Sequence, residues 1–211
     1  MNKVLDKIRQ DNKEIITLEE LKNYCKELYF NYKIISNYLI SRKFLIKILD
    51  DIFYVKTTDE INQNKLKIPV SELLGKALEL KNIDKWYFGL YTALKLNGIK
   101  FVHEDKYCYL INNRILINRP IKVLGKKYRF LRFQDSLFNF GIINGKIKYS
   151  DQEKTILDLL YLWEYSQKTE NRIINELSKL MDGSSKEKLV EYSEFYPKST
   201  ANILKKALNN F

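Results

Sequence analysis

The residues between Tyr32 and Lys43 have the types and spacing of a surface that reads DNA. A helix turns by about 100° per residue. That rotation places Lys33, Ser36, Asn37, Ile40 and Lys43 on one arc. Lysine binds phosphate, asparagine forms two hydrogen bonds with adenine, and an aliphatic side chain packs on a thymine methyl group. The arc predicts contact with double-stranded DNA, and the alternative is the solvated face of an ordinary amphipathic helix.

The opposite arc of this helix is expected to face the core, with Ile34, Ile35, Tyr38 and Leu39. From Leu28 to Leu49 the charged residues are all basic, namely Lys33, Arg42, Lys43 and Lys47. A local field of one sign favours a polyanion. We therefore add Arg42 and Lys47 to the predicted DNA-binding residues.

A second group of cations lies between Lys126 and Phe133, where basic and aromatic residues alternate. Lys126, Lys127 and Arg129 are predicted to contact a phosphate backbone. The rings in this segment have two interpretations. They could form a stacking platform for nucleic acid, or they could fill the core while the cations line the exposed side of a strand.

Catalytic chemistry has little support in the sequence. The single histidine, His103, belongs to no recognisable triad, and Cys25 and Cys108 form no Cys-x-x-Cys pair. No Walker loop is present, and no Asp-x-Asp pair for two-metal phosphoryl transfer follows Gly183-Ser184. We expect no catalytic residue, no metal site and no cofactor.

The predicted DNA-reading helix needs a small domain to present it. Val4 to Ile8 has helical spacing, and Thr17 with Glu20 forms a capping box that opens a second helix. After the third helix, two β-type runs, Leu45–Leu49 and Ile52–Lys56, meet at the tight turn Asp50-Asp51. Three helices and a hairpin predict a winged helix-turn-helix over residues 1–58. The polar stretch from Thr57 to Lys65 indicates an interdomain linker.

Residues 68–211 are predicted to form a larger α+β domain with a small, mostly antiparallel sheet and C-terminal helices. The expected helices are Val70–Leu80, Trp86–Asn97 with a stop at Gly98, and one that Ser150 caps and that runs to Tyr165. The expected strands are Tyr107–Ile111, Ile121–Leu124, Lys127–Phe133 and Lys146–Tyr149, with turns at Asn112-Asn113, Gly125-Lys126 and Asn144-Gly145. A break at Gly183-Ser184-Ser185 predicts two or three further helices.

The net charge of +11 is concentrated in one part of the chain. Residues 61–149 hold 17 basic and 6 acidic side chains, so this third carries the excess. Such a field favours DNA, RNA or an acidic protein, and the alternative is a lysine-rich surface that keeps the protein soluble. Without a signal peptide, a bilayer-length apolar run or a disulfide framework, the chain is expected to be cytoplasmic, with no membrane partner.

Two stretches of the chain resemble the AbiEi family of antitoxins and transcriptional regulators, which belong to type IV toxin–antitoxin and viral-defence loci. One runs from Thr17-Leu18-Glu19-Glu20-Leu21 through Tyr38-Leu39 to Ile52-Phe53-Tyr54-Val55. The other, Tyr149-Ser150-Asp151-Gln152-Glu153-Lys154-Thr155-Ile156-Leu157-Asp158, is similar to the family's Ser-Asp-x-Glu-[Arg/Lys]-Thr-x-Leu-Asp helix opening. Family members often have glycine at the wing turn, where this chain has Asp50-Asp51, an acidic tip that makes a poor phosphate contact.

The resemblance implies a repressor that binds inverted repeats at its own promoter and neutralises a partner toxin resembling a nucleotidyltransferase. In the second stretch, Asp158 lies within side-chain reach of Lys154, which predicts either a structural anchor for the helix or a partner contact. Two other functions stay open. One is a protein-binding antitoxin or adaptor whose winged helix is only a scaffold, and the other is an RNA-binding module.

Overall fold

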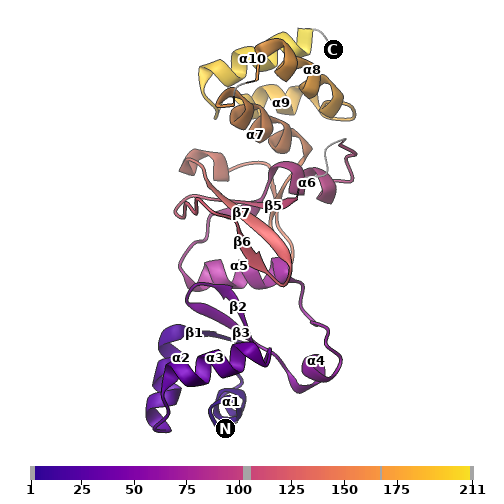
Figure 1. Ribbon diagram of the computed structural model, residues 1–211. Coiled ribbons are helices and arrows are strands. Elements are labelled where there is room, and N and C mark those ends of the chain that lie inside the picture. Colours follow the sequence, from indigo (N-terminus) through magenta and orange to yellow (C-terminus); the bar gives the residue numbers. More distant parts are fainter. Residues whose placement is uncertain (1–2, 102–105, 167, 210–211) are drawn as a thin grey trace. The chain divides into compact units, whose positions relative to one another are not determined.

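The computed structural model describes residues 3–101, 106–166 and 168–209, and Figure 1 shows their helices and strands. The chain divides into two compact units. Unit 1 comprises Met1–Asn82 with Val123–Gly125, and unit 2 comprises Ile83–Lys122 and Lys126–Phe211. His103 lies outside the described residues. Among those described, no helix has the length and apolar character needed to cross a membrane.

Unit 1 begins with the three helices and the hairpin that the sequence predicts. The elements are α1 (Lys3–Gln10), β1 (Ile15–Thr17), α2 (Leu18–Glu27), α3 (Tyr32–Ser41), β2 (Leu45–Leu49) and β3 (Ile52–Val55). The strands form an antiparallel sheet in the order β1–β3–β2. Strand β1 was not expected, because three residues are too few to show an alternating pattern.

The core of unit 1 joins one apolar face of each helix to the small sheet. Val4, Leu5 and Ile8 of α1 are buried as their spacing predicts. Thr17 caps α2 and forms the expected capping box with Glu20. Helix α3 contributes Ile35 and Leu39 to the same core. These contacts fix the orientation of α3 and therefore decide which of its residues face solvent.

The polar stretch from Thr57 to Lys65 is not an irregular linker, so that prediction was wrong. It contains α4 (Thr58–Asn62), which begins with a capping box between Thr57 and Glu60. The buried Glu60 carboxylate also accepts hydrogen bonds from the Tyr54 hydroxyl at 2.8 Å and from the Lys67 backbone at 2.7 Å. Together these donors hold the pKa of Glu60 below its ordinary value, although burial alone would raise it.

Helix α5 (Val70–Leu80) forms as predicted, with Pro69 at its N-cap. It groups with unit 1 and ends the main part of that unit, whereas residues from 68 onward were assigned to the second domain from the sequence. Lys76 on α5 pairs with Glu14 at 2.7 Å, and Lys81 pairs with Asp51 at 2.7 Å. These ion pairs join α5 and the residue after it to the N-terminal part of unit 1.

Unit 2 has a six-stranded sheet, short connecting helices and four C-terminal helices. Its strands are β4 (Trp86–Phe88), β5 (Tyr107–Asn112), β6 (Ile121–Val123), β7 (Lys126–Arg132), β8 (Ile142–Ile143) and β9 (Tyr149–Ser150), and the last residue of β6 groups with unit 1. Its helices are α6 (Leu90–Leu96), η1 (Asp135–Phe138), α7 (Gln152–Glu164), α8 (Glu170–Leu180), α9 (Lys186–Ser193) and α10 (Lys198–Asn209). An α+β fold is confirmed in this region.

The sheet of unit 2 is mixed, which corrects the expectation of a mostly antiparallel one. Its strand order is β6–β7–β5–β4–β9–β8, and the β5–β7 and β4–β9 pairs are parallel. Asn112 does not make a hairpin turn, because its side-chain oxygen accepts hydrogen bonds from the Arg114 and Ile115 backbones and directs the chain away. A crossover can then return the chain as a parallel strand.

Two predicted boundaries in unit 2 were wrong. Trp86–Phe88 is a strand and not the start of a helix, because it pairs antiparallel with β5 and the helix begins only at Leu90. The predicted strand Lys146–Tyr149 is displaced to β9, which pairs with β8 across a connection, residues 144–148, that begins with Asn144-Gly145. The predicted stop at Gly98 is confirmed by its φ of 75°.

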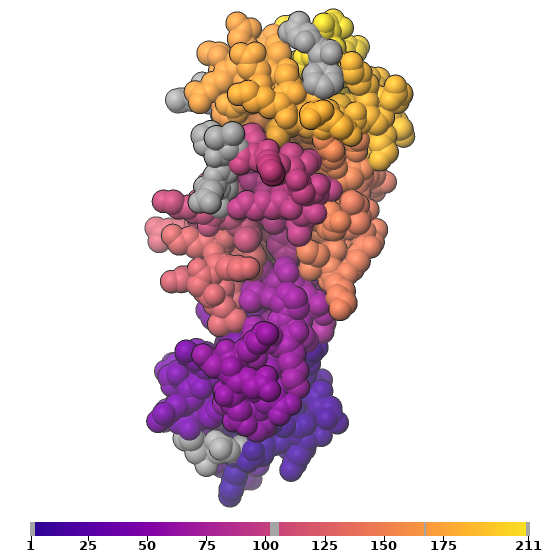
Figure 2. All heavy atoms as spheres, turned by 90° about the vertical axis from the view of Figure 1, so that its right-hand side faces the viewer, coloured from indigo at the N-terminus to yellow at the C-terminus, as the bar shows by residue number. Residues whose placement is uncertain are grey.

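The four helices α7 to α10 pack around a common apolar core. In the space-filling view they form one closely packed body, coloured orange to yellow (Figure 2). Helix α7 ends at Glu164, close to the predicted end, and the break at Gly183 separates α8 from α9. The cap of α7 is Asp151 and not Ser150, because Ser150 still belongs to strand β9.

Candidate nucleic-acid interface

Helix α3 is held by a side-chain cap at its start and by its buried face. The Asn31 side chain accepts a hydrogen bond from the Lys33 backbone at 3.0 Å and caps the helix. Ile35 is 5% exposed and Leu39 is fully buried, so the line through these two residues marks the inward side. The helix therefore presents a defined outward side to solvent.

The outward side carries Lys33, Ile34, Asn37 and Ser41, all exposed. We call these four residues the α3 strip. Ile34 is 68% exposed, whereas Ile40 is half-buried and packs against the core of unit 1. The sequence predicted the reverse for these two isoleucines. Lys33, Asn37 and Lys43 are exposed as expected, but Ile40 lies on the side of α3 that packs against the core of unit 1 and Ile34 does not.

The other predicted DNA-binding residues of unit 1 differ in their exposure and in whether they already have a partner within the protein. Ser36 is half-buried and its hydroxyl donates to the Lys33 carbonyl at 3.2 Å. Arg42 and Lys43 are exposed at the end of α3. Lys47 on β2 is exposed but pairs with Asp50 of the turn at 2.9 Å, so the acidic tip neutralises it. The exposed cations around α3 therefore lie at its two ends, and the cation of the hairpin is paired.

Tyr29 lies in the turn before α3, and sequence reasoning missed it. Its side chain is 97% exposed, and its backbone has a φ of 59°, the left-handed region that favours glycine. Its backbone amide donates a hydrogen bond to the Lys26 carbonyl, and the Phe30 amide donates one to the Cys25 carbonyl. This pair of hydrogen bonds is the Schellman pattern at the end of a helix. The signal in the sequence is a tyrosine at the position just after a helix where glycine or asparagine is usual.

In the basic strand of unit 2, β7, the aromatic rings are buried and the cations are exposed. Lys126, Lys127 and Arg129 are exposed, while Tyr128, Phe130 and Phe133 are buried. The interpretation as a core with cations on the exposed side therefore holds, and these three rings cannot stack on bases. The Arg129 guanidinium lies over the Tyr107 ring at 5.9 Å.

The stretch of residues 149–158 at the start of α7 contains a buried ion pair. The Lys154 ammonium lies 3.3 Å from Asp158, one turn further along the helix, and both side chains are fully buried. The hydroxyls of Tyr196 and Tyr87 donate to the two oxygens of Asp158 at 2.6 and 2.9 Å. The ring of Phe140 lies 4.6 Å from the ammonium. We call these five residues the α7 cluster.

The α7 cluster joins four separate segments of unit 2. Burial raises the pKa of the Asp158 carboxyl and lowers the pKa of the Lys154 ammonium, and the opposite charge of each partner offsets part of the shift. Gly141 allows the neighbouring loop to approach, since a Cβ there would lie 2.7 Å from Lys154 Cβ. This closed arrangement fits the predicted structural anchor and leaves little of the motif for a partner to touch.

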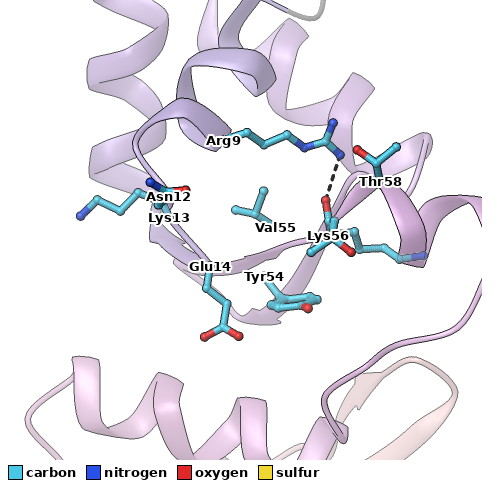
Figure 3. A pocket seen from close by; sticks show the side chains of 9 residues that line it. Arg9, Asn12, Lys13, Glu14, Tyr54, Val55, Lys56 and Thr58 are labelled. Atoms are coloured by element: carbon cyan, nitrogen blue, oxygen red, sulfur yellow. Dashed lines mark hydrogen bonds between the residues drawn. The ribbon is translucent and has the colours of Figure 1, made fainter.

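A separate hollow of about 400 Å³ lies in unit 1, between the end of α1, β3 and the start of α4. In Figure 3 the Arg9 guanidinium points across it and donates to the Lys56 carbonyl at 2.9 Å. None of the predicted site residues lines it. Among the described residues, no three His, Cys, Asp or Glu side chains gather as ligands of a metal ion would.

Comparisons with known proteins reveal a similar fold but no family. No protein-family model matches the chain, and no curated protein matches it. Among solved structures, the chain is similar to the crystal structure of the RV2827C protein from Mycobacterium tuberculosis. The TM-score is 0.59 and the identity is 12%, over 99% of this chain and 75% of that chain. At this identity the likeness concerns the fold alone.

Proposed function

We propose that this protein is a sequence-specific DNA-binding regulator whose unit 1 is a winged helix-turn-helix. The observation that carries the proposal is the α3 strip, a helix face with Asn37 and Lys33 exposed and with basic residues at its end. The order α1–β1–α2–α3–β2–β3 supports it, because this order presents the third helix of a winged helix to the major groove.

The second part of the proposal concerns the basic strand of unit 2. Lys126, Lys127 and Arg129 are exposed and close together on β7, and they add contacts to the phosphate backbone. Such contacts raise affinity without reading sequence, whereas the α3 strip supplies the sequence preference.

The resemblance to the AbiEi family extends the proposal to a biological role. In that role the protein represses its own promoter by binding repeated half-sites and neutralises a toxin that resembles a nucleotidyltransferase. The α7 cluster is closed, so the toxin would contact other surfaces of unit 2. Co-purification with the product of a neighbouring gene of the nucleotidyltransferase type tests this part on its own.

An electrophoretic shift assay with the DNA upstream of the gene tests the central part. With excess nonspecific competitor, the wild-type chain should retain that DNA, and Asn37→Ala should lower its preference over scrambled DNA by about tenfold, since a bidentate base contact contributes about 1–3 kcal/mol. Asn175→Ala is the matched control, because Asn175 is an exposed helical asparagine of unit 2.

Three outcomes would reject the proposal. Competition by unrelated duplex as effective as by the upstream DNA would exclude sequence preference. Stronger competition by structured RNA would favour the RNA-binding module. Equal loss of preference in Asn37→Ala and Asn175→Ala would show that α3 does not read the bases.

A further inference from the structure

Three of the exposed large apolar residues of unit 1 are gathered at one place. Tyr29, Phe30 and Ile34 are 97%, 37% and 68% exposed, whereas Leu80 and Leu124, each 53% exposed, lie elsewhere in the sequence. All three lie within six consecutive residues, in the turn before α3 and its first turn. A single exposed apolar residue needs no explanation, but a group of this kind marks a contact surface.

The backbone conformation at Tyr29, one member of this group, is unfavourable for its residue type. Several helices of this protein are followed, two positions after their last residue, by a residue with left-handed backbone conformation. After α1, α4, α5 and α6 this residue is, in turn, Asn12, Asn64, Asn82 and Gly98. These are the residue types for which that conformation is least costly. After α2 and α3 the same position holds Tyr29 and Lys43, with φ of 59° at each. Strained, exposed residues of this kind concentrate at functional sites.

The charge around the group identifies the class of its partner. No acidic residue lies between Leu28 and Leu49, and the cations Lys33, Arg42 and Lys43 are exposed there. A surface that is both apolar and positive fits a polyanion that carries apolar groups. In the major groove of DNA, those groups are the 5-methyl groups of thymine.

We propose that Ile34 determines specificity by packing against a thymine methyl group in the bound DNA. This inference rests on the proposed function and names the base pair that the α3 strip reads. Asn37 lies three residues further along the same exposed face, where it can pair with an adenine. The preferred site therefore contains A·T pairs at the positions that face Ile34 and Asn37, and Ile40, being half-buried, takes no part in reading it.

Replacing thymine by deoxyuridine removes only the methyl group and so isolates this contact. The probe is a duplex selected by the wild-type chain from a randomised pool, with each thymine changed to deoxyuridine in turn. At one position the wild-type chain should lose affinity by about fourfold, the effect of one buried methyl group. The Ile34→Ala variant should bind the thymine duplex more weakly and should not distinguish thymine from deoxyuridine at that position.

Two variants act as controls. Ile34→Val keeps a methyl surface and should restore most of the difference between thymine and deoxyuridine. Val190→Ala removes an exposed aliphatic side chain from α9 and should behave as the wild type. Because Ile34 is exposed, Ile34→Ala is expected to fold, and an unchanged circular dichroism spectrum checks this.

The inference fails if Ile34→Ala loses as much affinity on deoxyuridine substitution as the wild type does. It also fails if the variant binds DNA normally but changes the oligomeric state in light scattering, since the group would then be a protein contact. Failure of the proposed function would look different, because no sequence would be enriched from the pool.

Discussion

Tyr29 combines an unfavourable backbone conformation with a side chain that contacts little of the protein. In the left-handed region, a residue with a Cβ costs about 1–2 kcal/mol relative to glycine. Burial does not offset this, because the ring is 97% exposed. If the ring contacts DNA, replacing Tyr29 by glycine should raise the stability of unit 1 and lower its affinity for DNA.

Tyr29→Gly should therefore stabilise unit 1 by about 1 kcal/mol and weaken DNA binding. Amide hydrogen exchange at the buried residues of α2 and α3 measures the stability, since both tryptophans, Trp86 and Trp163, belong to unit 2. Asn12→Gly is the matched control, because Asn12 has a similar φ of 53° and should change stability by only a few tenths of a kcal/mol. A destabilised Tyr29→Gly variant would show that the ring supports the fold.

At the scale of elements, the start of α7 is held by the α7 cluster. A carboxylate or an ammonium buried without its partner destabilises a protein by about 3–5 kcal/mol, whereas replacing both by apolar residues can be nearly neutral. Asp158→Leu and Lys154→Met should each be strongly destabilising. The double variant should lose less unfolding free energy than the two single variants lose together, because it leaves neither charge buried without its partner.

Urea unfolding followed by tryptophan fluorescence measures this coupling, since Trp163 lies on α7 itself. A coupling energy of about 1 kcal/mol or more is expected between the two sites. Additive losses would mean that Lys154 and Asp158 act independently, which would contradict the account of the cluster as one unit.

The elements of unit 1 could largely be predicted from the sequence, because their signals are local. The capping box at Thr17 and the spacing of Val4, Leu5 and Ile8 each involve a few neighbouring residues. The face of α3 was harder to predict. Whether Ile34 or Ile40 lies outward depends on the sheet that α3 packs against, and helical spacing alone places both near the border of the apolar face.

The sheet of unit 2 could not be predicted from local signals. Pairing of β5 with β7 joins residues about twenty positions apart, with β6 lying between them in the sequence. Alternation identifies a strand but not its neighbour or its direction. The start of α4 was predictable in principle, because Thr57 and Glu60 repeat the spacing of Thr17 and Glu20.

At the scale of the whole molecule, charge is distributed unevenly. Residues 61–149 carry the positive excess, and the stretch that forms α7 to α10 is close to neutral. The cations of β7 are exposed, and for Lys126 and Lys127 no acidic partner is found among the described residues. Surface cations of this kind contribute to DNA binding mainly by releasing counterions.

The double variant Lys127→Ala and Arg129→Ala should weaken binding to all DNA sequences and reduce the salt dependence of binding. Each lost phosphate contact lowers the slope of log affinity against log salt by about 0.9, so a reduction of about 1.8 is expected. Lys179→Ala with Lys205→Ala removes the same charge from α8 and α10 and should leave the slope nearly unchanged. An unchanged slope in the first variant would remove unit 2 from the DNA interface.

If the α3 strip enters the groove of duplex DNA, the backbone amide resonances of Lys33, Ile34, Asn37 and Ser41 should shift when the isotope-labelled protein is titrated with its upstream DNA. The amide resonances of α8 and α10 should not shift in the same titration. DNA binding that shifts other resonances and leaves those of α3 unchanged would show that the α3 strip does not enter the groove.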